Sequence, residues 1–323
     1  MKILCEFTPA GYSLQRIALE DCPLAYLWRS YIRSFTSFTM SCLKYGGYAK
    51  PRFADLILWP SMYEDVVWPP PDTATVKLYM TDDDVSDGTL LFDGTAALDS
   101  YDRSGVKYRL KMQEHDHTTT AVLQNDTLVN LFTDYCGATK LDLTLDSTNA
   151  RSPSPAVYYT PSGDVQTIDL MDGMAAWFTH GFYILDGTLY LYDMLASGTP
   201  EALTEFDCQQ VTYRAGTPVS LFTSGGRSLA GSNAAGDTFD LATAYHSTAG
   251  NIDAALADIK TMVEKPRVEL PSKLSQHEVG LFGDFTLTDE STTRDTVSAA
   301  KAFAVKYNFD NETKLLDAVG SIS

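Results

Sequence analysis

Residues 167–192 read TIDLMDGMAAWFTHGFYILDGTLYLY, and this stretch decides the fold. Its apolar side chains first recur at the spacing of a helix, at Leu170, Met174, Trp177 and Phe178. Thr167 or Asp169 is the expected N-cap of that helix. Residues 182–185 predict a strand, Asp186-Gly187 a two-residue hairpin turn, and residues 188–192 the return strand. A helix followed directly by a tight hairpin indicates a compact α+β unit, and Trp177 and Phe178 are expected in its core.

Toward the N-terminus the sequence is typical of a β domain. Alternating or compact apolar runs predict strands near residues 31–40, 53–59, 75–80, 90–96 and 106–111. Gly46-Gly47 is expected to form a turn, and Trp68-Pro69-Pro70-Pro71 an extended linker. We therefore assign residues 1–115 to an N-terminal β domain.

The middle segment, residues 116–223, is predicted to be an α+β domain built around the helix and hairpin. Asp126 is the expected N-cap of a second helix, which Gly137 ends. Residues 141–145 alternate as a half-buried strand.

The last segment, residues 224–323, begins with a Gly- and Ala-rich stretch, Ser224–Ala235, that predicts a flexible loop or arm. Asn251 is then expected to cap a helix that runs to Val263, and Pro266 ends it. Strands near 267–270, 281–287 and 302–309 follow. The whole chain thus predicts a β-rich α+β protein of small barrel- or sandwich-like domains with a few short helices.

The composition supports an ordered, extended fold with an acidic surface. Of 323 residues 44% are hydrophobic, and 18 Tyr and 15 Phe fall mostly in the predicted strands. Asp and Glu total 42 against 24 Lys and Arg, which gives a net charge of −18. This surface repels phosphate backbones and argues against nucleic-acid binding. The acidity is explained either by solubility or by a lumen through which DNA slides, with Asp82, Asp83, Asp84 and Asp87 as candidate lumen residues or as a solvated turn.

The N-terminal sequence and the pattern of cysteines predict a protein made in the cytoplasm. A charged residue, Glu6, breaks the first apolar run, so neither a signal peptide nor a membrane span is expected. The five cysteines are scattered and contain no Cys-x-x-Cys pair, which favours free thiols over a zinc or redox site: Cys5, Cys22, Cys42, Cys136 and Cys208.

Candidate chemistry is sparse. His115-Asp116-His117 could supply two metal ligands, but a third must come from elsewhere, and solvated histidines explain the motif as well. His180, at a helix end, could be a base, a dipole partner or a buried polar group. Residues 81–85 resemble a calcium loop without its glycine and closing glutamate, and residues 225–228 do not complete a phosphate loop. We expect no catalytic, cofactor-binding or metal site, and no cofactor.

Two stretches resemble the tail-tip hub proteins of long-tailed bacteriophages and prophages. The first is Leu91-Phe92-Asp93-Gly94-Thr95-Ala96 with the strand 106–110, together with upstream segments 47–53 and 68–71. The second runs from Ile168 through Trp177 and His180-Gly181-Phe182-Tyr183-Ile184 to Asp193-Met194-Leu195 and Leu203-Thr204-Glu205-Phe206-Asp207. Residues 252–263, 266–270 and 307–312 resemble the family more loosely, and Cys208-Gln209-Gln210 and 224–236 depart from it.

The resemblance implies small β-barrel and α+β domains of the kind that build tail tubes and hubs, and an assembly role without catalysis. It implies a homotrimeric hub, or alternatively a homohexameric distal tail ring, at the tail tip of a virion. The implied partners are the distal tail ring, the tape measure and the central fibre, and the hub would help to form the DNA ejection channel.

Two other functions compete with this interpretation. A tail-associated cell-wall hydrolase would need paired carboxylates or a histidine metal site in one cleft. A carbohydrate-binding receptor module would need exposed aromatic faces, for which Trp28, Trp59 and Trp68 are the candidates.

Overall fold

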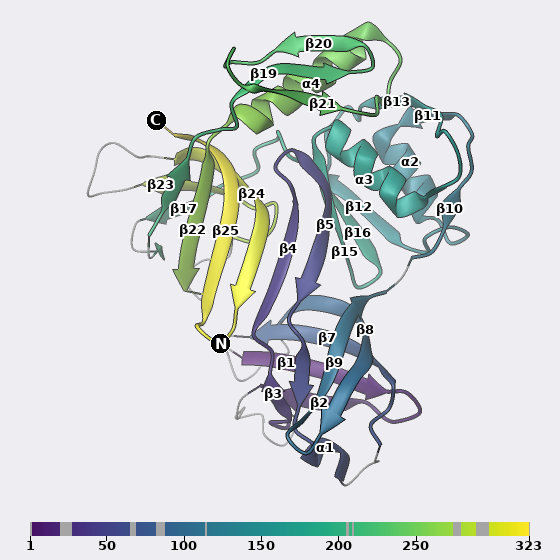
Figure 1. Cartoon of the computed structure of the whole chain (residues 1–323), viewed down its shortest axis with the longest axis vertical. Helices are drawn as coiled ribbons and strands as arrows, with labels where there is room; N and C mark the ends of the chain where they lie inside the picture. Colours follow the sequence, from purple (N-terminus) through teal and green to yellow (C-terminus); the bar gives the residue numbers. More distant parts are fainter. Residues whose placement is uncertain are drawn as a thin grey trace.

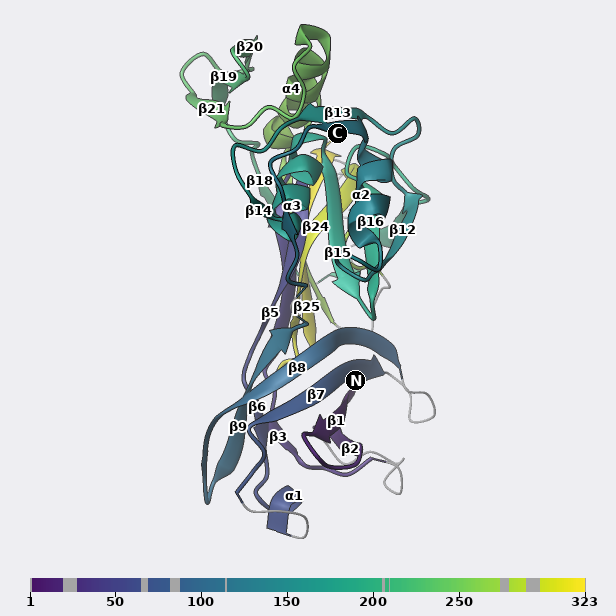
Figure 2. The same ribbon diagram turned by 90° about the vertical axis from the view of Figure 1, so that its right-hand side faces the viewer.

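The computed structural model describes residues 2–19, 28–64, 69–81, 88–113, 115–204, 207–208, 210–273, 279–288 and 297–322. Two large sheets make up most of the chain, and α2, α3 and α4 gather at one end of the molecule, far from the N-terminal sheet (Figures 1 and 2). The predicted β-rich α+β class is confirmed. Among the described residues, no helix combines the length and apolarity that crossing a bilayer requires.

The first sheet, which we call the barrel sheet, has seven strands. In sheet order they are β2 (Gln15–Ala18), β1 (Lys2–Pro9), β7 (Thr73–Thr81), β8 (Thr89–Asp102), β9 (Gly105–Met112), β6 (Leu56–Leu58) and β3 (Ile32–Ser34). Its two edges meet because the backbone at Arg29, just before β3, forms a bridge to Ile17 in β2. The amide of Arg29 donates to the carbonyl of Arg16 over 3.0 Å. The sheet is therefore a nearly closed barrel.

Alternation in sequence explains these strands. In β9, Val106, Tyr108 and Leu110 are buried, whereas Arg109 and Lys111 between and beyond them are exposed. Successive side chains of a strand point to opposite faces, so this pattern places one face in the barrel core and one in solvent. The predicted strands at 75–80, 90–96 and 106–111 are confirmed in β7, β8 and β9.

The second sheet, which we call the large sheet, has eleven strands. Its main path is β12 (Thr144–Asn149), β16 (Thr188–Asp193), β15 (His180–Leu185), β5 (Gly46–Phe53), β4 (Ser37–Leu43), β24 (Val297–Asn308), β25 (Thr313–Ile322), β22 (Arg267–Lys273) and β18 (Thr212–Arg214). Off this path, β23 (Asp284–Thr288) pairs with β24, and β17 (Glu201–Thr204) pairs with β23. All three segments predicted as domains contribute strands to this one sheet.

One long hairpin connects the two sheets. The half that contains the turn, β4 and β5, lies in the large sheet (Figure 1), and the continuation of these strands, β3 and β6, lies in the barrel sheet (Figure 2). Stacked rings follow it, with 5.4 Å between the ring centres of Phe35 and Phe309 and 6.0 Å between those of Phe38 and Tyr307. A single hydrophobic core therefore extends from the barrel into the C-terminal strands.

The turn of this hairpin differs from the prediction. Lys44 and Tyr45 form the turn, and Gly46 and Gly47 open β5. Gly46 has φ of +126°, and a Cβ there would lie 2.2 Å from the carbonyl oxygen of His180. Glycine is needed because β5 leaves the turn in a conformation closed to other residues and passes directly against the chain at β15.

Four helices occur among the described residues: α1 (Ser61–Glu64), α2 (Leu128–Cys136), α3 (Thr167–Trp177) and α4 (Ala249–Glu264). The last three share a core with β15, β16 and β19. The predicted helices are confirmed, but their starts differ. The N-cap of α2 is Thr127, which accepts from the amide of Asn130 over 3.3 Å; Gln166 precedes α3, and Thr248 precedes α4.

Two segments differ more clearly. The segment 224–235, predicted as a loop or arm, contains the strand β20 (Arg227–Ala230). With β19 (Val219–Ser224) and β21 (Asp237–Leu241), β20 forms a three-stranded sheet that packs on α4 (Figure 1). The strand predicted at 141–145 begins only at Thr144, because the amides of Leu141 and Leu143 bond to the carbonyls that end α2. Short pairs complete the fold: β10 (Thr118–Thr119) with β14 (Val165–Gln166), and β11 (Gln124–Thr127) with β13 (Ala156–Tyr159).

Candidate functional site

The two histidines of the His115-Asp116-His117 motif bond to different elements. His115 Nδ1 lies 3.1 Å from the carbonyl oxygen of Leu141, and His117 Nδ1 lies 2.7 Å from the hydroxyl of Thr167. Within the described part of the chain, no three His, Cys, Asp or Glu side chains lie together as metal ligands. The motif therefore joins its own segment to the loop after α2 and to the first residue of α3.

Four of the five cysteines lie in the described ranges, and all four are free thiols: Cys5, Cys42, Cys136 and Cys208. Burial raises the pKa of Cys136 to about 12, and burial together with the nearby Asp207 raises that of Cys208 to about 12. At neutral pH these thiols are protonated and weakly nucleophilic.

The acidic candidates Asp82, Asp83, Asp84 and Asp87, together with Trp68 and Cys22, lie outside the described residues. Of the two remaining tryptophans proposed for sugar binding, Trp28 is buried, which corrects the expectation that its face is exposed. Trp59 is 44% exposed, and the guanidinium of Arg33 covers its ring at 5.2 Å.

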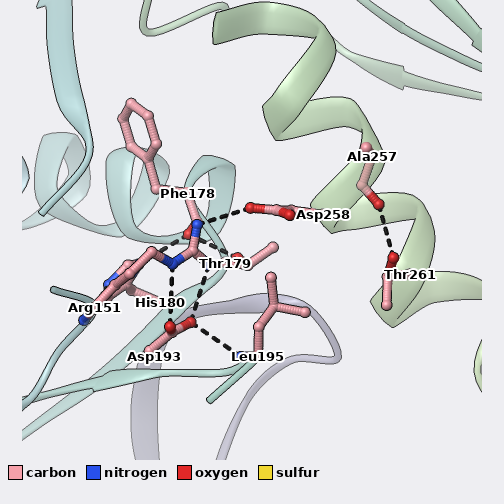
Figure 3. A network of polar contacts seen from close by, with 9 residues as sticks. All are labelled: Arg151, Phe178, Thr179, His180, Asp193, Leu195, Ala257, Asp258 and Thr261. Atoms are coloured by element: carbon pink, nitrogen blue, oxygen red, sulfur yellow. Dashed lines mark hydrogen bonds and ion pairs between the residues drawn. The ribbon is translucent and has the colours of Figure 1, made fainter. Parts of the chain in front are cut away.

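A network of polar contacts between the loop after β12, the β15–β16 hairpin and α4 is centred on Arg151 (Figure 3). Its Nε and Nη2 bind the two carboxylate oxygens of Asp193, each over 3.0 Å, in a bidentate pair. Nη1 donates to Asp258 in α4 over 2.7 Å, and Nη2 donates to the hydroxyl of Thr179 over 2.9 Å. Arg151 therefore ties the loop after β12 to the β15–β16 hairpin and to α4, and we call this set, with His180, the Arg151 junction.

His180 completes the Arg151 junction as a neutral ring. Its Nδ1 donates to the carbonyl of Phe178 over 2.8 Å, and its Nε2 accepts from the amide of Arg151 over 3.3 Å. Burial lowers the pKa of His180 to about 4, although the carboxylate of Asp193 acts in the opposite direction. Of the three roles left open by the sequence, a buried and satisfied polar group is the one that this geometry supports.

The junction predicts a dependence of stability on pH. Because the pKa of His180 falls from 6.5 in its ordinary state to about 4 in the fold, only the unfolded chain binds this proton between those values. The stabilisation is complete above pH 6.5 and is lost as the pH falls to 4, by roughly 3 kcal/mol at 1.36 kcal/mol per unit. Unfolding in urea at a series of pH values measures it.

The control is His180→Asn, which keeps a donor near Phe178 but does not titrate. Its stability is expected to change less than that of the wild type between pH 7 and pH 4. The titration of Asp193 does not affect the comparison of the two proteins between pH 7 and pH 4. Burial acts to raise its pKa, but the hydrogen bonds from Arg151 and Leu195 lower it below 3.8, so its contribution is lost only at more acidic pH. Parallel curves for the two proteins would contradict the assignment.

A pocket of about 420 Å³ lies between the end of β9, β5, β15 and the start of α3. It is lined by Tyr48, Met112, Gln113, His115, Asp116, Gln166, Ile168 and Ile184. We call it the β9 pocket. It brings His115 and Asp116 of the sequence motif to one rim, whereas His180 lies in the Arg151 junction.

Sequence reasoning missed Arg151, Asp193 and Asp258 as partners. They stand 42 and 65 positions apart along the chain, and each is an ordinary charged residue in its own segment. No spacing rule connects side chains that meet only after a sheet and a helix have packed.

Three solved structures with a similar fold are described as tail proteins. The 43 kDa tail protein of prophage MuSo2 from Shewanella oneidensis matches with a TM-score of 0.58 at 11% identity, over 98% of this chain and 97% of that chain. A tail protein from Neisseria meningitidis matches with a TM-score of 0.56 at 9% identity, over 99% and 97%. A prophage tail protein from Listeria monocytogenes matches with a TM-score of 0.55 at 9% identity, over 98% and 94%.

No protein-family model matches the sequence, and no curated protein matches it. The similarity is thus one of fold, at identities near a tenth, but it extends over nearly the whole of both chains in each case. This confirms, at the level of the fold, the resemblance predicted from residues 168–207. The chain has the fold of these tail proteins.

Proposed function

We propose that this chain is a structural component of the tail tip or baseplate of a long-tailed bacteriophage or prophage. In this role it forms a hub or ring that joins the tail tube to the receptor-binding apparatus and helps to form the DNA ejection channel. The observation that carries the proposal is the agreement in fold, end to end, with three proteins described as tail proteins.

The sheet edges support an assembly role. In the described part of the chain, β12 and β18 end the main path of the large sheet, and each pairs with one strand, β16 and β22 respectively. An edge strand offers backbone donors and acceptors to a strand of a neighbouring chain, which is a common means of joining subunits.

The proposed assembly is a homotrimer, with a homohexamer as the alternative, in the virion. Its proposed partners are the distal tail ring, the tape measure and the central fibre. The acidic composition is compatible with a DNA channel because a wall of like charge does not retain phosphates. A hydrolase remains the enzymatic alternative, and its test is activity on peptidoglycan.

The copy number of the chain in a purified particle tests the proposal. We expect a multiple of three, because the proposed homotrimer and the alternative homohexamer are both closed rings with cyclic symmetry. Quantitative mass spectrometry against the tube subunit, or symmetry in electron micrographs of the tip, measures it. A single copy per particle, or recovery only in the capsid, would overturn the hub assignment.

A further inference from the structure

The turn between β8 and β9 forms a rigid, exposed tip. The carboxylate of Asp102 accepts from the amide and the hydroxyl of Ser104, each over 2.6 Å. Arg33 donates to the carbonyl of Ser104 and lies over the ring of Trp59 at 5.2 Å. These contacts fix the turn to the end of the barrel sheet. We call Trp59, Tyr101 and Arg103 the hairpin tip.

The side chains of the hairpin tip are those that dominate protein interfaces. Trp59 is 44% exposed and Tyr101 is 45% exposed, and Arg103 beside them is exposed and has no ion pair with any residue that the structure describes. Tryptophan, tyrosine and arginine contribute most of the binding energy at interfaces. A turn that is already ordered loses little conformational entropy when it binds.

The β9 pocket has the complementary chemistry. Its walls are apolar, with the ring of Tyr48 and the side chains of Met112, Ile168 and Ile184. Its rim offers acceptors. Nδ1 of His115 donates to the carbonyl of Leu141 over 3.1 Å, so the tautomer that makes this bond leaves Nε2 as an acceptor. The carboxylate of Asp116 is exposed and bonds to none of the described residues. An apolar wall with an anionic rim fits a cation on an apolar stem, as in an arginine beside an aromatic ring.

The hairpin tip and the β9 pocket cannot meet within one molecule. The tip precedes Gly105 and the pocket contains Met112, so the eight residues of β9 separate them by roughly 25 Å. A contact between them must join two copies, head to tail. Contacts of this heterologous kind repeat from copy to copy and close into a ring when the rotation allows it.

The distribution of charge along the chain also favours a contact between the hairpin tip and the β9 pocket. Residues 1–112, which include the hairpin tip, hold 12 basic and 14 acidic residues, whereas residues 113–323 hold 12 basic and 28 acidic residues. The tip therefore belongs to the nearly neutral part, and Asp116 stands where the strongly acidic part begins. A second copy approaching head to tail places its cation against this acidic part, and the attraction orients the encounter.

We propose that the hairpin tip of one copy docks into the β9 pocket of a second copy, with Arg103 against Asp116. This inference rests on the proposed function, since it names the contact through which the ring subunits would join. It is specific, however, to two surfaces, and the ring proposal does not depend on them.

A charge exchange tests the contact. Arg103→Glu and Asp116→Arg are each expected to weaken self-association of the full chain by about tenfold or more, because each places like charges together. The double variant is expected to recover most of the lost affinity, because the pair is restored in reverse. Sedimentation velocity over a concentration series, at low and at high salt, measures the association, which is expected to weaken with salt.

The matched control is Arg52→Glu, an exposed arginine of β5 that lies away from the hairpin tip and has no ion pair among the described residues. It changes the net charge as Arg103→Glu does, but it should leave self-association unchanged. All four proteins are expected to unfold at similar temperatures, since the substituted side chains are exposed.

Three results overturn the inference: single variants that associate as the wild type does, a double variant that is no better than the worse single one, or a wild type that stays monomeric up to about 100 μM. The proposed function is judged separately, by copy number in the particle. A multiple of three there together with any of these results would retain the ring and reject this contact.

Discussion

Trp177→Ala is expected to destabilise the protein by roughly 3–5 kcal/mol, the cost of removing a large aromatic side chain from a close-packed core. Trp177 is 1% exposed at the end of α3, where its ring meets that of Phe178 edge-on, with 4.6 Å between the ring centres. Its Nε1 donates to the hydroxyl of Ser224 over 3.2 Å, so the variant also leaves a buried hydroxyl without its partner. The core position predicted from the sequence is confirmed.

Urea unfolding of both proteins measures the change in free energy. The matched control is Trp59→Ala, which removes the same side chain from an exposed site and is expected to cost less than about 1 kcal/mol. Ser224→Ala separates the hydrogen bond from the packing and is expected to account for about 1 kcal/mol. A Trp177 emission maximum typical of water, seen in the difference between wild type and variant, would contradict the core assignment.

Asp193→Ala is expected to cost about 3–5 kcal/mol, because it leaves the half-buried guanidinium of Arg151 without its bidentate partner. The side chain of Asp193 is 6% exposed, and besides Arg151 it accepts from the amide of Leu195 over 3.0 Å. The loss should appear as a lower midpoint of urea unfolding, and also as earlier loosening of α4, which Arg151 holds through Asp258.

Two variants separate the charge from the geometry. Asp258→Ala removes the other carboxylate, which is 32% exposed and makes one contact with Arg151, and it should cost no more than about 2 kcal/mol. Arg151→Met combined with Asp193→Leu removes both members of the buried pair and should be less destabilising than Asp193→Ala alone, because no unpaired charge remains. If the double variant is the least stable of the set, the ion pair itself stabilises the fold. The destabilisation in Asp193→Ala would then not be due to an unpaired buried charge.

The elements with strong local patterns were predictable. Alternation in β7, β8 and β9 and the helical spacing before Trp177 are properties of short segments, and the structure keeps them. The hairpin at Asp186-Gly187 was predictable for the same reason, since both residues take positive φ, 49° and 69°, as a tight two-residue turn requires.

Predictions failed where a remote segment decides the local structure. Residues 227–230 contain one bulky apolar side chain, Leu229, yet they form a strand because they pair with the neighbouring β19 and pack on α4, which is remote in sequence. The tertiary structure also explains Gly173 inside α3: a Cβ there would lie 2.1 Å from the hydroxyl of Tyr245, so glycine lets that tyrosine approach. Tyr245 stands 72 positions from Gly173, and α4 begins 19 positions after Ala230, so neither packing contact is visible in the local sequence.

The sequence by itself determined the class of the fold, most of its strands and helices, and the resemblance to tail proteins, because hydrophobic periodicity and turn chemistry act over a few residues. Only the tertiary structure decided which strands are neighbours. It placed β5 beside β15, closed the barrel between Ile17 and Arg29, and brought Arg151 to Asp193 and Asp258. The reason is that pairing between distant strands and ion pairs between distant side chains depend on how whole elements pack, which no local pattern specifies.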